Sequence, residues 1–280
     1  RYDILQSYMV FGGIPYYLSY FKKGLSLTAN IDNILFGKNP RLNDEFNRLF
    51  NAIFTNPEDC KKIISLLAKR HIGYTREEIS EETNIPFGGG LTNTLNALIE
   101  SDFVQKYNPY NTHGKVVRYK LIDNFCLFWL KYVDENVHKS DFMTENISSE
   151  ILKSWRGVAF EELCWQHINP IKRALGISGI SSSLSAWNVK GDDNKEGVQI
   201  DLLISRNDNV VNLCEMKFAG DTYTIDKDED AKLRNRIETL KQTLSAKQSV
   251  HLTMITTFGI TYGKYSGIVQ KEVTMDDLFE

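Results

Sequence analysis

The fold of this chain is decided by the stretch VQIDLLISRNDNVVNLCEMKF, which spans residues 198–218. Two largely apolar runs flank the polar triplet Asn207-Asp208-Asn209, so the stretch predicts two antiparallel strands joined by a tight turn. Because side chains alternate along a strand, the first strand is expected to present two different faces. One face is formed by Val198, Ile200, Leu202 and Ile204, and the other by Gln199, Asp201 and Leu203.

The charged side chains of the second strand are expected to share a face with Asp201. If the turn has three residues, Asp201 lies directly opposite Glu215, with the two Cβ atoms about 4.5–5.5 Å apart. A two-residue turn would shift the register by one and separate the two carboxylates. Carboxylates at that spacing repel each other, and a divalent cation such as Mg²⁺ or Mn²⁺ between them removes the repulsion.

Lys217 follows Glu215 by two residues, so it points to the same side about 7 Å further along the strand. An ammonium beside a metal-bound water stabilises hydroxide or the charge that develops on a phosphate. An acid on the preceding helix, Glu161 or Glu162, is expected to complete the shell, and helix phase does not decide between them. The alternative is that Asp201, Glu215 and Lys217 are solvated charges on an exposed sheet face.

The elements around this hairpin predict an α/β domain over residues 157–280. A helix begins at Gly157, and a strand is expected over Ile177–Val189. After the hairpin, Asp230–Leu244 has the apolar spacing of a helix, and Val250–Thr256 is an apolar strand. The resulting order is α-β-β-β-α-β.

The upstream half predicts a helical domain of winged-helix type over residues 44–133. Asn56-Pro57 and the capping box Thr75-Arg-Glu-Glu78 start two helices, and Leu91–Ser101 is a third. Two strands follow, Val104–Tyr107 and Lys115–Leu121, with a turn at 108–114 between them. An aromatic helix over 124–132 closes the domain, residues 134–156 are interpreted as a linker, and residues 1–43 as the tail of a preceding domain.

The motifs resemble a known nuclease superfamily. Gln199-Ile200-Asp201 with Cys214-Glu215-Met216-Lys217 is similar to the core of PD-(D/E)XK nucleases, as in archaeal Holliday-junction resolvases and restriction endonucleases. More narrowly, the whole chain resembles the C-terminal portion of a prokaryotic AAA+-type ATPase, of the archaeal-type ATPase family. The stretches that carry this resemblance are 11–15, 157–161, 198–204, 213–218 and 251–256.

The resemblance implies an α+β chain, in which a helical winged-helix domain precedes a restriction-endonuclease-like domain. It implies metal ligands at Asp201, Glu215 and Glu161, a catalytic lysine at Lys217, and DNA as partner. Residues 1–43 would then be the tail of an ATPase lid region, and the ATPase domain of the same chain a further partner. No GxxxxGK[ST] motif occurs, so ATP is expected to bind only in the full-length protein.

Two sets of basic residues are candidates for DNA contact. The expected wing carries Lys115, Arg118 and Lys120, which suit phosphates. The helix Asp230–Leu244 carries Lys232 and Arg234, either along a substrate backbone or on a solvated face of mixed charge. The third helix of the winged domain has no Arg or Lys, so DNA contact and a packing role are weighed equally for it.

Composition limits these readings. The 280 residues carry a net charge of −3, so DNA binding needs a local basic patch. The four cysteines form no CxxC pair, and no apolar run has the length of a membrane span, so a cytoplasmic protein without a membrane partner is expected. Three functions follow: a Mg²⁺-dependent DNA endonuclease, a catalytically inactive nuclease-like module that binds DNA or a protein, and an assembly protein, with a homo-oligomer possible in each case.

Overall fold

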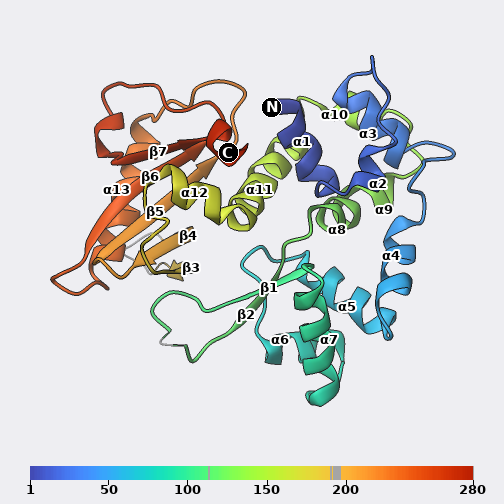
Figure 1. Cartoon of the computed structure of the whole chain (residues 1–280), viewed down its shortest axis with the longest axis horizontal. Coiled ribbons are helices and arrows are strands. Elements are labelled where there is room, and N and C mark those ends of the chain that lie inside the picture. Colours follow the sequence, from blue (N-terminus) through green and yellow to red (C-terminus); the bar gives the residue numbers. More distant parts are fainter. Residues whose placement is uncertain (113, 190, 192–196, 280) are drawn as a thin grey trace. The chain divides into compact units, whose positions relative to one another are not determined.

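The structure is a computed structural model that describes residues 1–112, 114–189, 191 and 197–279. The chain is α+β and divides into two compact units. One unit comprises Asp3–Lys106 and Arg118–Ala159, and is called here the helical unit. The other comprises Arg1–Tyr2, Tyr107–Val117 and Phe160–Glu280, and is called here the sheet unit. Figure 1 shows the elements of each.

The helical unit is built from short helices and one two-stranded sheet. Its elements, including the full spans of those that reach the boundary between the units, are α1 (Tyr2–Phe11), α2 (Pro15–Leu18), α3 (Leu27–Leu35), α4 (Glu45–Ile53), α5 (Pro57–Leu67), α6 (Arg76–Thr83), α7 (Gly89–Glu100), β1 (Val104–Tyr107), β2 (Arg118–Leu121), α8 (Asn124–Phe128), a π-helical turn (Trp129–Val133), α9 (Asp134–Asn136), α10 (Phe142–Asn146) and α11 (Glu150–Gln166).

Helices α5, α6 and α7 followed by β1 and β2 have the order expected from the sequence. Asn56 caps α5 by accepting from the amide of Asp59, with Pro57 at the first helical position. Thr75 and Glu78 form the expected capping box at the start of α6. The second strand begins at Arg118, three residues later than predicted, and the turn before it includes His113, which lies outside the described residues.

Residues 134–156 are helical over much of their length, whereas their polar composition predicts a linker. Phe142 of α10 stacks on Phe36, with ring centroids 4.8 Å apart. The buried carboxylate of Asp32 accepts from the amides of Met143 and Thr144 at 2.7 and 3.0 Å. The segment therefore packs within the helical unit. Although most of its residues are polar, a few of its side chains, such as Phe142 and Met143, are buried.

The sheet unit contains the α-β-β-β-α-β order predicted from the sequence, with one additional helix and one additional strand. Its elements after α11 are α12 (Ile168–Ala174), β3 (Ser182–Val189), β4 (Val198–Arg206), β5 (Val210–Lys217), α13 (Lys227–Lys241), β6 (Ser249–Thr256), a 3-10 turn (Ser266–Ile268), β7 (Lys271–Thr274) and a second 3-10 turn (Met275–Phe279). The strand order is β3-β4-β5-β6-β7. The first two pairings are antiparallel and the last two are parallel.

The core of the sheet unit lies between α13 and one face of the sheet. Leu233 and Leu240 of α13 are fully buried against Leu203, Leu213 and Leu252 of the central strands. This apolar contact fixes α13 beside β4 and β6 (Figure 1). From this position Glu229 and Arg236 of α13 reach Lys217 and Glu215 at the end of β5.

Candidate functional site

The hairpin β4–β5 has the register that a three-residue turn predicts. Leu202 pairs with Cys214 and Ser205 pairs with Val211, on either side of the loop Asn207–Asn209. Asn209 adopts φ +64°, a left-handed conformation that asparagine tolerates better than most residues. The ladder ends at Leu202, one residue before Asp201 and Glu215.

A β-bulge in strand β4 changes the direction in which Asp201 points. On β3, Ser185 pairs with Leu203 and Trp187 pairs with Ile200, so one residue of β3 faces two residues of β4. As a result Ile200 and Leu203, three positions apart, pack in the same core. The expected face of Val198, Ile200, Leu202 and Ile204 is therefore wrong beyond Ile200, because regular alternation does not continue through the bulge.

Asp201 lies next to an acid of α11. One carboxylate oxygen of Asp201 and one of Glu161 lie within 4.8 Å of each other. The side-chain amide of Gln199 donates to Asp201 Oδ1 at 2.7 Å, and the indole N–H of Trp165 donates to the Asp201 carbonyl oxygen at 2.8 Å. The Trp165 contact ties α11 to β4 where the two carboxylates meet.

The structure favours Glu161 over Glu162 as the helix acid. Glu161 is partly exposed and reaches Asp201, whereas Glu162 has 1% of its surface exposed. Two partly exposed carboxylates offer the hard oxygen donors that Mg²⁺ and Mn²⁺ prefer, and their mutual repulsion favours a cation between them. The residues present therefore fit a divalent cation by their chemistry.

Glu215 and Lys217 belong to a second group of charges, formed with α13. Arg236 donates to Glu215 Oε2 at 2.6 Å, and the Lys217 ammonium lies 2.9 Å from Glu215 Oε1. The same ammonium lies 3.0 Å from Glu229 of α13. Burial by itself would lower the pKa of Lys217, but the carboxylates of Glu215 and Glu229 outweigh it and raise that pKa. Lys217 is therefore a cation at neutral pH.

The charged residues of the predicted site thus form two groups in place of one cluster. By alternation from Ile200, Asp201 points away from the core beneath α13, while Glu215 points toward α13 with Leu213. Arg236 is not among the residues predicted for the site, and its ion pair with Glu215 makes it part of the second group. Its position seven residues after Glu229, two turns along one face of α13, is the signal that could have identified it.

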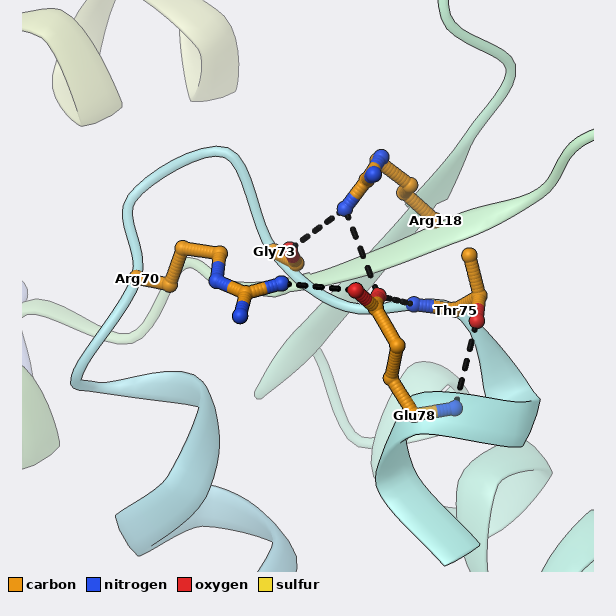
Figure 2. A network of polar contacts seen from close by, with 5 residues as sticks. All are labelled: Arg70, Gly73, Thr75, Glu78 and Arg118. Carbon is orange, nitrogen blue, oxygen red and sulfur yellow. Dashed lines mark hydrogen bonds and ion pairs between the residues drawn. The ribbon is translucent and has the colours of Figure 1, made fainter. Parts of the chain in front are cut away.

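The candidate DNA-binding residues of the expected wing have different surroundings. Arg118 donates to the Gly73 carbonyl oxygen at 2.9 Å and lies 3.5 Å from Glu78, which also accepts from Arg70 at 2.8 Å (Figure 2). Lys120 has 3% of its surface exposed, and Lys115 is exposed. Arg118 is thus engaged within the protein and Lys120 is buried, whereas Lys115 is accessible to a phosphate.

The candidates on α13 are both exposed. Arg234 pairs with Asp230, with Nε and Oδ2 2.9 Å apart, and 59% of its side chain is exposed. Lys232 lies one helical turn before Arg236. Both residues lie within four positions of Arg236 on α13, the helix that contacts the Glu215–Lys217 pair.

The described residues contain no helix with the length and apolar character needed to cross a membrane.

Comparisons with known proteins show little beyond this. No family model and no curated protein matches the chain. Among solved structures, a protein of unknown function, AF1548, is similar at 19% identity with a TM-score of 0.29, covering 41% of this chain and 64% of its own. Protein VC1899 from Vibrio cholerae is similar at 13% identity with a TM-score of 0.26, covering 90% of this chain and 57% of its own. The chain thus spans about three fifths of each of these proteins, and scores this low carry no argument about function.

Proposed function

We propose that the sheet unit is a PD-(D/E)XK nuclease-like domain that binds a divalent cation and hydrolyses phosphodiester bonds in DNA. The observation that carries the proposal is the approach of the Glu161 and Asp201 carboxylates within 4.8 Å. Glu161 lies on α11 and Asp201 on β4, the helix and the strand that the motif predicts, and the Glu215–Lys217 pair lies on the adjacent strand β5. The α-β-β-β-α-β order supports the same assignment.

The wider assignment rests on the sequence motifs. We infer that the chain is the C-terminal region of a prokaryotic AAA+-type ATPase and that α5, α6, α7, β1 and β2 form a winged helix. The helix and strand order of the helical unit supports the winged-helix reading. In this account the nucleotide is bound upstream by the ATPase core, in a cytoplasmic protein.

Each residue of the proposed site has a distinct role. Glu161 and Asp201 would hold Mg²⁺ or Mn²⁺, which supplies charge neutralisation and a water of lowered pKa. Lys217, which its raised pKa keeps protonated, pairs with Glu215 and Glu229 on the α13 side of the sheet, so it would stabilise the charge on a phosphate beside Asp201 only after these contacts change. The Gln199 amide orients the Asp201 carboxylate. Glu215 would join the cation only after its contacts with Arg236 and Lys217 change.

The second candidate is a catalytically inactive module of the same fold that binds DNA or a protein. One observation favours it: both Glu215 oxygens have cationic partners, Arg236 and Lys217. A carboxylate neutralised twice in this way has little charge left for a metal ion. The domain would then retain the nuclease architecture and bind DNA without cleaving it.

The test is a cleavage assay on the whole chain. Wild-type protein is incubated with plasmid and with junction DNA in Mg²⁺ or Mn²⁺, beside Asp201→Asn and Lys217→Ala. Metal-dependent cleavage that both substitutions abolish supports the enzyme. Retained DNA binding without cleavage in either metal supports the inactive module. If no DNA binds at low salt, where phosphate contacts are strongest, the enzyme and the DNA-binding form of the inactive module both fail.

A further inference from the structure

Among the residues that the structure describes, Glu215 at the end of β5 is the partner of the Arg236 guanidinium. Its Nη1 donates to Glu215 Oε2 at 2.6 Å, and 23% of its side chain is exposed. In the described part of the chain, one guanidinium nitrogen makes this contact. A bidentate ion pair with a phosphate would use two nitrogens in parallel, which is the stronger geometry for arginine.

The ion pair of Arg236 with Glu215 belongs to a group of two acids and two bases. Glu215 pairs with both Arg236 and Lys217, and Lys217 also pairs with Glu229, so the charges of two acids and two bases balance. Glu215 has 12% of its side chain exposed. A carboxylate so little exposed is costly to leave unpaired, which explains why Arg236 stays on it in the free protein.

The part of α13 around and after Arg236 is richer in basic residues than the chain as a whole. From Lys232 to Lys241, α13 carries four basic residues and one acid, Glu238, in a protein of net charge −3. Lys232 and Arg234 are exposed, and Lys232 is one turn from Arg236 on the helix surface. Arg234 pairs with Asp230 and Lys241 pairs with Glu238, so the positive charge that this part of α13 offers to a nucleic-acid backbone comes from Lys232 and Arg236.

We propose that Arg236 binds a backbone phosphate of DNA and that Glu215 is the partner it leaves when DNA binds. The exchange replaces one anion by another at the guanidinium and releases Glu215 from its contact with Arg236 at 2.6 Å. The inference rests on the DNA-binding part of the proposed function and is independent of cleavage. Glu215 and a DNA phosphate therefore compete for Arg236.

The two partners of this ion pair predict effects of opposite sign on DNA affinity. With a short labelled duplex at low salt and in EDTA, Arg236→Gln should weaken binding about tenfold, the effect of losing one charged hydrogen bond. The slope of log affinity against log salt should fall in magnitude by about 1. Glu215→Gln should tighten binding, because Arg236 no longer has an anionic partner inside the protein.

A second arginine of the sheet unit provides matched controls. Arg206 pairs with Asp208 on the β4–β5 turn, with Nε donating to Oδ1 at 2.9 Å. Asp208→Asn removes the same charge as Glu215→Gln and releases an arginine in the same way, and should leave affinity unchanged. Arg206→Gln should also leave it unchanged.

Each outcome decides the inference. If wild-type protein binds DNA but Arg236→Gln binds equally well, or if Glu215→Gln and Arg236→Gln weaken binding together, Arg236 has a structural role and the inference is wrong. If Asp208→Asn tightens binding as much as Glu215→Gln, the effect is one of net charge and the inference is again wrong. If Arg236→Gln does not fold, tightening by Glu215→Gln beside an unchanged Asp208→Asn still supports it. No binding by the wild type removes the proposed function itself.

Discussion

Glu78 shows how one side chain holds several segments together. It accepts from the Thr75 amide at 2.7 Å within the capping box, and its carboxylate also faces Arg70 and Arg118 (Figure 2). Burial by itself would raise the pKa of Glu78, but the Thr75 amide and the two arginines outweigh it and hold that pKa below its ordinary value of 4.5. The loop before α6 and the start of β2 are thereby fixed to one carboxylate.

The lowered pKa of Glu78 predicts an acid-dependent loss of stability. Stabilisation by the charged form is fully present above a pH of about 4.5 and is lost as the pH falls through the lower pKa of the folded state. Glu78→Gln keeps the capping geometry and removes the charge, so it should cost about 1 kcal/mol or less at neutral pH, because the arginines are partly exposed. Urea unfolding of both proteins across pH should show the difference narrowing below pH 4.5; a constant difference would contradict the assignment.

Gly73, in the same network, is required by both its conformation and its surroundings. It adopts φ +74°, and a Cβ added there would lie 2.2 Å from the carbonyl oxygen of Tyr119. Gly73→Ala should therefore destabilise the helical unit by about 2–5 kcal/mol, the sum of the cost of the left-handed backbone conformation and the cost of the clash. Gly24 also has a positive φ, +89°, but open space around it, so Gly24→Ala should cost about 1–2 kcal/mol. Equal losses in chemical denaturation would show that the Tyr119 contact does not matter.

At the scale of the element, α13 has two different faces with two different tasks. Leu233 and Leu240 are fully buried against the sheet, while Glu229 and Arg236 contact the end of β5. Packing of the apolar face sets the position from which the charged face works. A change on the apolar face should therefore alter stability first and the ion pairs only as a consequence.

Leu233→Ala tests the packing of α13. The side chain has no exposed surface, so its truncation should cost about 2–5 kcal/mol through lost burial and a residual cavity. Asn235→Ala, on the exposed side of the same helix, should change stability by about 0.5 kcal/mol or less. Thermal unfolding followed by circular dichroism measures both, and a small effect at Leu233 would mean that α13 does not pack as described.

In strand β4, the hairpin with β5 is predictable from the sequence and the bulge is not. The sequence leaves a two-residue and a three-residue turn open for the β4–β5 hairpin, and the observed register is that of the three-residue turn. The bulge opposite Ala186 depends on how β4 pairs with β3, the strand that precedes it in the sequence. No local pattern in residues 198–206 signals it, so the direction of Asp201 could not be predicted.

For the whole molecule, the sequence predicts the order of elements better than it predicts their partners. The α+β class and the α-β-β-β-α-β order follow from periodicity and turn residues. The helical packing of residues 134–156 does not, because Phe142 and Trp155 are buried by aromatic residues far away in the sequence. The surroundings of Arg118 and Arg236 likewise depend on acids brought close by folding. Patterns therefore locate candidate charges, and tertiary pairing decides which of them are available.

The central claim is that Glu161 and Asp201 hold a divalent cation in a nuclease-like domain, and Mn²⁺ titration calorimetry of the whole chain tests it most directly. We expect wild-type protein to bind Mn²⁺, and Asp201→Asn and Glu161→Gln to lose that binding. Asp208→Asn, which removes an acid from the same unit without touching the pair, should bind as the wild type does. Absence of binding by the wild type, or equal binding by all four proteins, would contradict the account.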